Sequence, residues 1–142
     1  MVDAEIEIIR QMGVEIRCGI EVGKDITLDE LRAQGYKAFY LAIGCQGGRL
    51  AGIPGETAEG VMTAVDFLRK TGADKSYPVE GRTVVVGGGN VAIDVARTAT
   101  RCGASEVSMY CLEGRDIMPA SAEEVEEAEE EGIAVNCGQK KY

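Results

Sequence analysis

A run of glycines followed by small residues is the part of this sequence best suited to bind a charged ligand. Gly87, Gly89 and Ala92 follow the spacing G-x-G-x-x-A in the stretch VVVGGGNVAIDVA. In such a pattern the first glycine allows a tight turn, and the second lets the backbone approach a pyrophosphate. The small third residue lets a helix pack close to its strand. The candidate phosphate-binding residues are therefore Gly87, Gly88, Gly89, Asn90, Val91 and Ala92.

The elements that must position these glycines are predicted on both sides of them. Residues 83–86 (TVVV) indicate a buried strand, residues 91–102 an amphipathic helix, and residues 106–112 (EVSMYCL) a second strand. The free amide groups and the dipole at the helix start would favour phosphate charge. A glycine turn between a strand and a helix is the context that a dinucleotide-binding fingerprint requires. The alternative is a glycine-rich turn of an α/β domain that binds no nucleotide. The predicted apolar stripe of the helix comprises Val91, Val95, Ala99 and Cys102.

An acidic residue closes the second predicted strand. Glu113 follows Gly89 by 24 residues (113 − 89), near the spacing expected for an acid that binds the ribose of a dinucleotide. Its carboxylate could accept hydrogen bonds from both ribose hydroxyls of NAD and would repel the 2′-phosphate of NADP. We therefore expect NAD rather than NADP. Two alternatives stay open: Arg115 could reach a 2′-phosphate, and Glu113 could be an exposed turn residue.

Composition argues against several other functions. The chain has 142 residues and a net charge of −9, with seven glutamates between Glu123 and Glu131. This acidity disfavours a nucleic-acid partner, whose phosphates are bound largely by Lys and Arg. The glutamate run is either an acidic docking face or a solvated helix surface. No apolar run approaches the ~20 residues of a membrane helix.

The cysteines give no sign of a metal site or of a redox centre of the C-x-x-C type. The chain has five cysteines, no C-x-x-C pair and no histidine. Zinc sites use Cys and His at short paired spacings, so no metal site is expected. Buried free thiols in a reducing cytosol are the expected state.

The remaining elements are predicted from local patterns and include a short repeat. GVEIRCG at residues 13–19 returns as GIAVNCG at residues 132–138, in both cases after a charged helical run. Thr27 opens a short helix with a capping-box pattern, and Thr63 is a candidate cap for a later one. The other expected elements are a helix at 4–12, strands at 14–18 and 38–44, and a glycine-rich loop at 45–60.

An ordered set of motifs gives a family resemblance. LAIG-x-Q, GIPGE, GGGNVAIDVARTA and MPAS-x-EE-x-EEA-x-EEGI occur here in the order found in the small subunit of bacterial glutamate synthase. The chain also resembles the flavin parts of dihydropyrimidine dehydrogenase and of ferredoxin:NADP transhydrogenases. The resemblance implies an NAD(P) domain inserted in an FAD domain, and the repeated segments would be the third strand of each. It further implies that Gly44 lies near the FAD.

The departures from the family shape the expected function. No earlier G-x-G-x-x-G or cluster of iron–sulfur cysteines is present, and Cys111-Leu112-Glu113 stands where NADPH-using relatives carry Tyr-Arg-Arg. We therefore expect a segment of a longer flavoprotein, with FAD bound by the parent but not by this chain.

The resemblance implies a Rossmann-like parallel sheet with flanking helices, plus remnant strands of an FAD-binding domain. The expected parts are an FAD-domain remnant at 1–50, a connection at 51–80 and a C-terminally truncated NAD(P)-binding domain at 81–142.

In the parent, NAD(P)H would reduce FAD, which would pass electrons to another acceptor. We expect the chain alone to be inactive and to contain no catalytic acid or base. Its expected partners are NAD, the missing FAD and iron–sulfur domains or a larger subunit, and a second copy of itself. A cytoplasmic location is expected. A non-catalytic nucleotide-binding or interaction module is the alternative.

Overall fold

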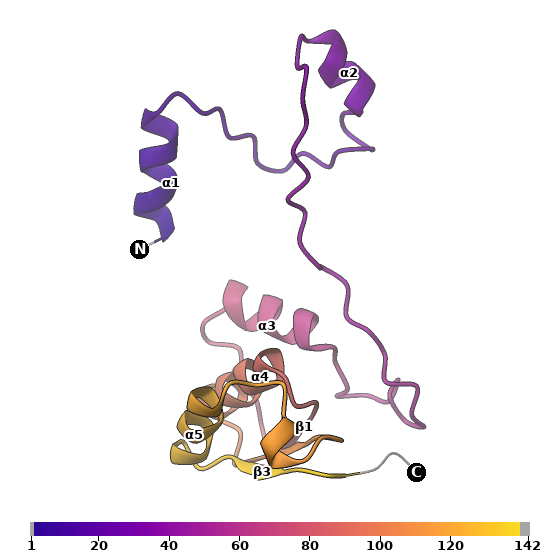
Figure 1. Cartoon of the computed structure of the whole chain (residues 1–142), viewed down its shortest axis with the longest axis vertical. Helices are drawn as coiled ribbons and strands as arrows, with labels where there is room; N and C mark the ends of the chain where they lie inside the picture. The colour runs from indigo at the N-terminus through magenta and orange to yellow at the C-terminus, as the bar shows by residue number, and fades with distance from the viewer. Residues whose placement is uncertain (1, 140–142) are drawn as a thin grey trace. The chain divides into compact units, whose positions relative to one another are not determined.

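The computed structural model describes residues 2–139 and divides the chain into two units (Figure 1). The N-terminal unit comprises residues 1–43, and the C-terminal unit comprises residues 44–142. The N-terminal unit contains helices α1 (Val2–Gln11) and α2 (Leu28–Ala33). A capping box starts α2, because the Glu30 carboxylate accepts from the Thr27 N–H at 2.8 Å while the Thr27 hydroxyl accepts from the Glu30 N–H at 3.2 Å. Both predicted helices of this unit are confirmed.

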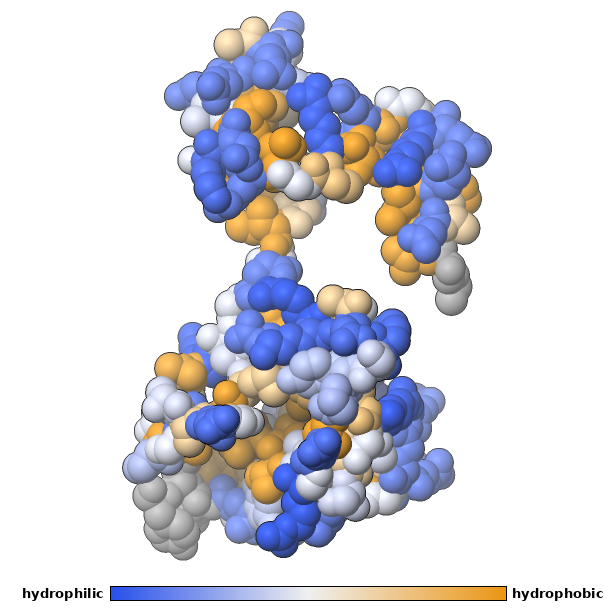
Figure 2. Space-filling view, turned by 180° about the vertical axis from the view of Figure 1, so that it is seen from behind, coloured by the Kyte–Doolittle hydropathy of each residue, from blue (hydrophilic) through white to orange (hydrophobic). Residues whose placement is uncertain are grey.

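The N-terminal unit has no buried residue among those described, 2–43. Its apolar side chains lie at the surface, drawn orange in Figure 2, and Tyr40 is 93% exposed. The strands predicted at 14–18 and 38–44 are wrong, since neither forms a ladder and the isolated bridge of this unit joins Val22 to Ile26. The physical reason is that an extended segment becomes a strand only when a neighbouring strand takes up its backbone groups.

The C-terminal unit is built on a parallel three-stranded sheet with the order β1-β2-β3. Its strands are β1 (Arg82–Val86), β2 (Glu106–Tyr110) and β3 (Ala134–Asn136). In the centre of the sheet, Met109 pairs with Val85 on one side and with Val135 on the other. The parallel strands, each followed or preceded by a helix, confirm the predicted α/β class.

Helices cover one face of this sheet. Helices α4 (Asn90–Arg101) and α5 (Ala122–Glu130) contact the strands, whereas α3 (Ala64–Ala73) packs on α4, and a short 3-10 helix, η1 (Arg115–Ile117), lies between β2 and α5 in the sequence. Helix α4 contacts β1, β2, α3 and α5, and α5 contacts β3 (Figure 1). Small residues bring α4 close to the strands: Ala96 and Ala99 are fully buried, and Ile93 is 1% exposed. Dispersion and apolar burial at this contact form the core. The other core members include Phe67, Val107, Met109, Val125, Ala128 and Ile133.

Two predictions about burial need correction. The stripe of α4 that faces the core consists of Ala92, Ile93, Ala96 and Ala99, whereas Val91 is 53% exposed. The strand at 83–86 is not buried on both faces, because Val84 and Val86 are 61% and 63% exposed. Side chains alternate across a strand, so Val85 faces the helices while its neighbours face the side on which these helices do not pack.

Between the end of α2 and the start of β1, the chain is irregular apart from helix α3. The Thr63 hydroxyl accepts from the Asp66 N–H at 3.3 Å and caps α3 as predicted. Within residues 2–139, none of the helices combines the length and the apolar character needed to cross a lipid bilayer.

Candidate functional site

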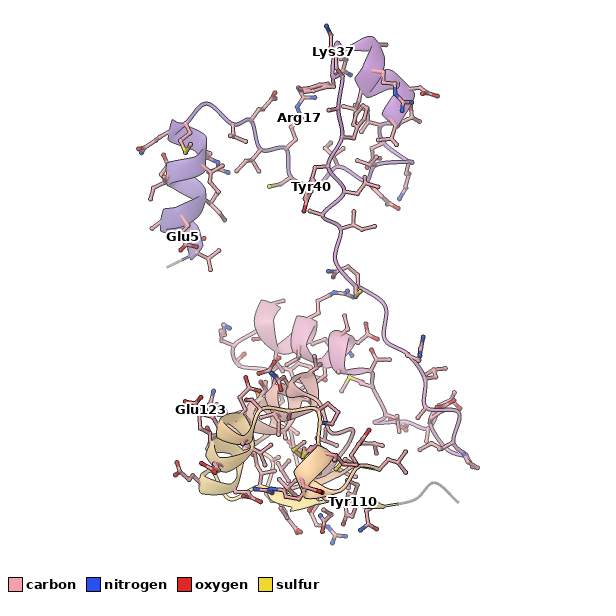
Figure 3. All side chains as sticks on the ribbon, viewed as in Figure 1. Glu5, Arg17, Lys37, Tyr40, Tyr110 and Glu123 are labelled. Carbon is pink, nitrogen blue, oxygen red and sulfur yellow. The ribbon has the colours of Figure 1, made fainter. Side chains whose placement is uncertain are left out.

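The first glycine of the motif makes the turn from β1 into the loop. Gly87 has φ +147°, which favours glycine, and its N–H donates to the Tyr110 carbonyl at 2.9 Å. A Cβ atom on Gly87 would lie 3.3 Å from the Ala92 Cβ, so the turn and the helix meet closely. Tyr110 marks the end of β2 in Figure 3. The small residues at both positions therefore let α4 start directly above the carboxyl ends of the strands.

The additional glycine lies against the end of the second strand. Gly88 is buried, and a Cβ atom on it would lie 2.9 Å from the Cys111 Cβ and 3.2 Å from Glu113 Oε2. No side chain fits there without displacing these groups. The structure thus brings Gly88 and Glu113 together beyond the carboxyl end of β2.

The third glycine faces open space. A Cβ on Gly89 would meet no atom within 4 Å, and Gly89 is the N-cap of α4 with no side-chain capping bond. The first amide groups of a helix have no acceptor within the helix, and they carry the positive end of its dipole. The start of α4 is therefore uncapped by protein and approachable by an anion.

Residues just before α5 hold the glycine loop from the side. The Ala120 N–H donates to the Gly88 carbonyl at 2.9 Å, and the Ser121 N–H donates to Asn90 Oδ1 at 3.0 Å. The Ser121 hydroxyl also caps α5 by accepting from the Glu124 N–H at 3.3 Å. Sequence reasoning missed this support, although the S-x-x-E pattern at residues 121–124 is a cap signal that could have placed Ser121 at a helix start.

The backbone of Glu113 is fixed by the chain beyond β3. The Gly138 N–H donates to the Glu113 carbonyl at 2.8 Å, and the Gln139 N–H donates to the Cys111 carbonyl at 2.8 Å. The side chain of Glu113 is half-buried. Its carboxylate lies beside the glycine loop, with Oε2 3.2 Å from the position of a Cβ on Gly88, and is partly open to solvent.

Arg115 is engaged elsewhere. Its guanidinium donates two hydrogen bonds to the Glu129 carboxylate, at 2.6 and 2.7 Å. This fork-shaped pair holds the pKa of Glu129 below its ordinary value. Arg115 would have to leave Glu129 before it could reach another anion.

The glutamate-rich helix is partly neutralised by neighbouring arginines. Arg97 pairs with Glu127 at 2.5 Å and with Glu131 at 2.7 Å, and Arg101 pairs with Glu131 at 2.6 Å. Hydrogen bonds from Arg97 and Arg101 lower the pKa of Glu131. Other carboxylates of the run are exposed, among them Glu123, which is labelled on α5 in Figure 3. Two of the seven glutamates, Glu127 and Glu131, therefore join the α5 segment to α4.

Two other residues predicted for the site, Val91 and Gly44, do not take part in the contact between Gly88 and Glu113. Val91 is exposed on the first turn of α4. Gly44 precedes α3 with φ +64°, and a Cβ on it would lie 3.1 Å from Gln46 Nε2. Among residues 2–139, no group of three or more His, Cys, Asp or Glu side chains is arranged to hold a metal ion.

The cysteines differ from the expectation of uniformly buried thiols. Cys111 is buried, but Cys18 and Cys45 are exposed and the other two are half-buried. Burial raises the pKa of the Cys111 thiol, and the neighbouring Cys137 and Glu113 raise it further. The buried sulfur under Gly88 is therefore a neutral thiol near pH 7.

Comparison with known proteins identifies relatives. The family model described as "pyridine nucleotide-disulphide oxidoreductase" matches residues 3–141. The chain is 43% identical over 132 residues to the NADP(+)-dependent formate dehydrogenase subunit beta of Moorella thermoacetica, covering 91% of this chain and 18% of that protein. It is 38% identical to the NAD-dependent dihydropyrimidine dehydrogenase subunit PreT of Escherichia coli K12, covering 97% of this chain and 33% of PreT.

A further relative and a solved structure agree with these matches. The chain is 36% identical to the glutamate synthase [NADPH] small chain of Escherichia coli K12, covering 89% of this chain and 29% of that one. Mycobacterium tuberculosis FprA in complex with NADPH superposes with a TM-score of 0.62 at 28% identity, covering 78% of this chain and 30% of FprA. The chain therefore spans about a third or less of the length of these relatives.

Proposed function

The chain belongs to the pyridine nucleotide-disulphide oxidoreductase family, and we propose that it is the nicotinamide-dinucleotide-binding part of a flavin-dependent oxidoreductase. When bound, the nicotinamide supplies a hydride, which the flavin of the parent protein would accept and pass on as electrons to another acceptor. The role of the residues in this chain is to bind and orient the dinucleotide.

One observation carries the proposal: the contact of Gly88 with the end of β2. It leaves no room for a side chain between the loop and Glu113, whose Oε2 would lie 3.2 Å from a Cβ on Gly88. A phosphate-binding turn and a ribose-binding acid must lie this close together, because one adenosine moiety contacts both. A dinucleotide site must also let a pyrophosphate approach the backbone. The open space at Gly89 and the uncapped start of α4 allow this approach. The residues present therefore fit the dinucleotide.

Each proposed binding residue has a distinct task. The backbone of Gly88 and Gly89 and the first turn of α4, from Asn90 to Ala92, would bind the pyrophosphate. The Glu113 carboxylate would accept hydrogen bonds from the adenosine ribose. Asn90 would contribute its backbone, since its side-chain oxygen already accepts from the Ser121 N–H.

We propose a preference for NAD over NADP. The relatives' names include both cofactors, so the proposal rests on Glu113 and on the engagement of Arg115 by Glu129. A carboxylate ~4 Å from a 2′-phosphate adds roughly 1 kcal/mol of repulsion per unit-charge pair in water. Arginine contacts that NADPH-binding relatives make would be absent, at roughly 1.5–3 kcal/mol each.

The rest of the parent protein is also a matter of proposal. Residues 1–50 would belong to the FAD-binding domain, with Gly44 near the flavin, and residues 81–142 to the NAD(P)-binding domain. Relatives named as subunits suggest that the parent works with a larger partner. The chain alone is proposed to be inactive, because the hydride acceptor would lie in the other parts of the parent.

Titration of NADH and NADPH into the purified chain tests the proposal. Wild type should bind NADH at least ~100-fold more tightly than NADPH, the combined effect of the charge terms above. Glu113→Arg should narrow or reverse the preference. Glu130→Arg is the matched control, because it makes the same charge change at an exposed site on α5 and should leave the preference unaltered.

Two results would contradict the proposal at different levels. Absence of binding for both nucleotides by folded protein would refute the dinucleotide site. Tighter NADPH binding by wild type, or an unchanged preference in Glu113→Arg, would refute the role of Glu113 alone.

A further inference from the structure

Two cysteines that are far apart in the sequence meet at the carboxyl end of the sheet. The register of β2 and β3 pairs Met109 with Val135 and Tyr110 with Asn136. The Cys111 N–H continues this ladder by donating to the Asn136 carbonyl at 3.0 Å. The next pair in the same register is therefore Cys111 opposite Cys137.

The two thiols lie on the same face of the sheet. Met109 is fully buried under the helices and Val135 packs against the same core. Side chains two residues further along a strand return to that face, so both sulfurs point toward the helix-covered side. Burial agrees, because Cys111 is 4% exposed and Cys137 is half-buried.

The Cys111 thiol is in contact with its surroundings through weak hydrogen bonds. It lies within donating distance of the Glu113 carbonyl at 3.5 Å and of the Asn136 carbonyl at 3.8 Å. Burial raises the pKa of the Cys111 thiol, and the nearby Cys137 thiol raises it further. The two sulfurs are thus neighbours in the reduced protein.

We propose that Cys111 and Cys137 form a dithiol site, which hydrogen peroxide oxidises to a reversible disulfide. Partners on adjacent strands have Cα atoms about 4.8 Å apart, within the range of about 4.4–6.8 Å found across disulfides. The Cβ atoms must be drawn together from ordinary strand spacing, and a bridge under such strain is readily reduced again.

The reaction proceeds in two balanced steps. The half-exposed Cys137 sulfur attacks a peroxide oxygen, the O–O bond breaks, and Cys137 becomes a sulfenic acid with release of water. The Cys111 sulfur then attacks the Cys137 sulfur, the S–O bond breaks, and the leaving hydroxide takes the Cys111 proton to form a second water. Two thiols lose two electrons in total, and one hydrogen peroxide is reduced to two waters.

The different exposure of the two cysteines determines which one reacts first with peroxide. Cys137 is accessible to an oxidant, whereas the buried Cys111 is held as a neutral thiol, which is a poor nucleophile toward peroxide. Cys111 therefore acts as the resolving thiol, and its proximity to Cys137 compensates for its low thiolate fraction.

The bridge would also alter the glycine loop. A Cβ on Gly88 would lie 3.4 Å from Cys111 Sγ, so this sulfur is part of the surface on which the loop rests. Moving the sulfur toward Cys137 removes that support and the hydrogen bond to the Glu113 carbonyl. Weaker dinucleotide binding by the oxidised protein is expected; this consequence rests on the proposed function, whereas the disulfide itself does not.

The test is a thiol count on the whole chain after brief exposure to hydrogen peroxide. Intact mass after alkylation should show free thiols falling from five to three, five minus the bridged pair. Tandem mass spectrometry of the non-reduced tryptic digest should place the bridge between Cys137 and Cys111, not Cys102 of the same peptide, and a reducing agent should restore all thiols. Cys137→Ser should abolish the bridge, while Cys102→Ser, which changes another half-buried cysteine, should retain it.

A second probe keeps the proposal testable if a variant fails to fold. Phenylarsine oxide, a trivalent arsenical, bridges two neighbouring thiols without oxidising them, and it should block Cys111 and Cys137 together in wild type. Five free thiols after peroxide, a bridge between any other pair, or arsenical modification that spares this pair would overturn the proposal. Disulfide formation without nucleotide binding in either redox state would instead count against the proposed function alone.

Discussion

Replacement of Gly88 by alanine should destabilise the C-terminal unit through one contact. The new Cβ would lie 2.9 Å from the Cys111 Cβ. Carbon atoms pack at about 3.5–4.0 Å, so the overlap is roughly 0.6–1.1 Å. The Cys111 Cβ is attached directly to the backbone of the strand end and cannot rotate away. Gly88 is not among the glycines with positive φ, so backbone strain adds little.

The expected magnitude follows from this overlap. Overpacking at such a site costs about 1–3 kcal/mol, and for a unit of this size each kcal/mol lowers the melting temperature by roughly 4–8 °C. Urea unfolding followed by circular dichroism should therefore show a lower midpoint with an unchanged slope. The cost arises at the loop and the strand end, which are also the proposed binding surface.

Gly72→Ala is the matched control for this substitution. Gly72 lies within α3, and a Cβ on it would meet no atom within 4 Å. Alanine in a helix interior should be neutral or stabilising by about 0.5–1 kcal/mol. If Gly88→Ala unfolds at the wild-type midpoint while Gly72→Ala behaves as expected, the close approach of the loop to Cys111 is not present in solution.

Two further outcomes follow from the site and from its ion pairs. Gly89→Ala should fold with near-wild-type stability, because the new Cβ enters open space. It should bind NADH more weakly in the nucleotide titration, because the pyrophosphate would approach through that space. Equal affinity would refute this placement of the pyrophosphate. The lowered pKa values of Glu129 and Glu131 should stabilise the fold above about pH 4.3, the unfolded value, and this contribution should be lost as pH falls through the folded values. Urea midpoints between neutral and acidic pH measure the loss, which should be smaller in Arg115→Ala; an equal loss would show that the Arg115–Glu129 pair contributes nothing.

Sequence patterns correctly predicted the features that depend only on residues close together in the chain. The spacing around Gly87 and Ala92 placed the strand, the turn and the helix of the candidate site, because each feature depends on neighbours within a few residues. The capping signals at Thr27 and Thr63 succeeded for the same reason. A cap requires only the next turn of the chain.

Long-range features were not accessible in this way. The apolar run at 38–44 has strand composition, but no pattern within it supplies the partner strand that a ladder requires. The exposure of Val84 and Val86 likewise depends on which face of the sheet receives helices. The pairing of Cys111 with Cys137 depends on the β2–β3 register, which cysteine counting cannot reveal.

The same distinction bears on how the proposed cofactor choice is controlled. Glu113 is the proposed ribose-binding residue, yet its backbone is positioned by the Gly138 N–H, at 2.8 Å, from the chain that follows β3. The neighbouring bond from the Gln139 N–H to the Cys111 carbonyl, also 2.8 Å, fixes the same strand end from the same side. A change in the β3 segment would shift Glu113 relative to the glycine loop without altering any residue of the motif. In the proposed site, the segment that follows β3 therefore positions the backbone of Glu113, the residue on which the proposed preference for NAD depends.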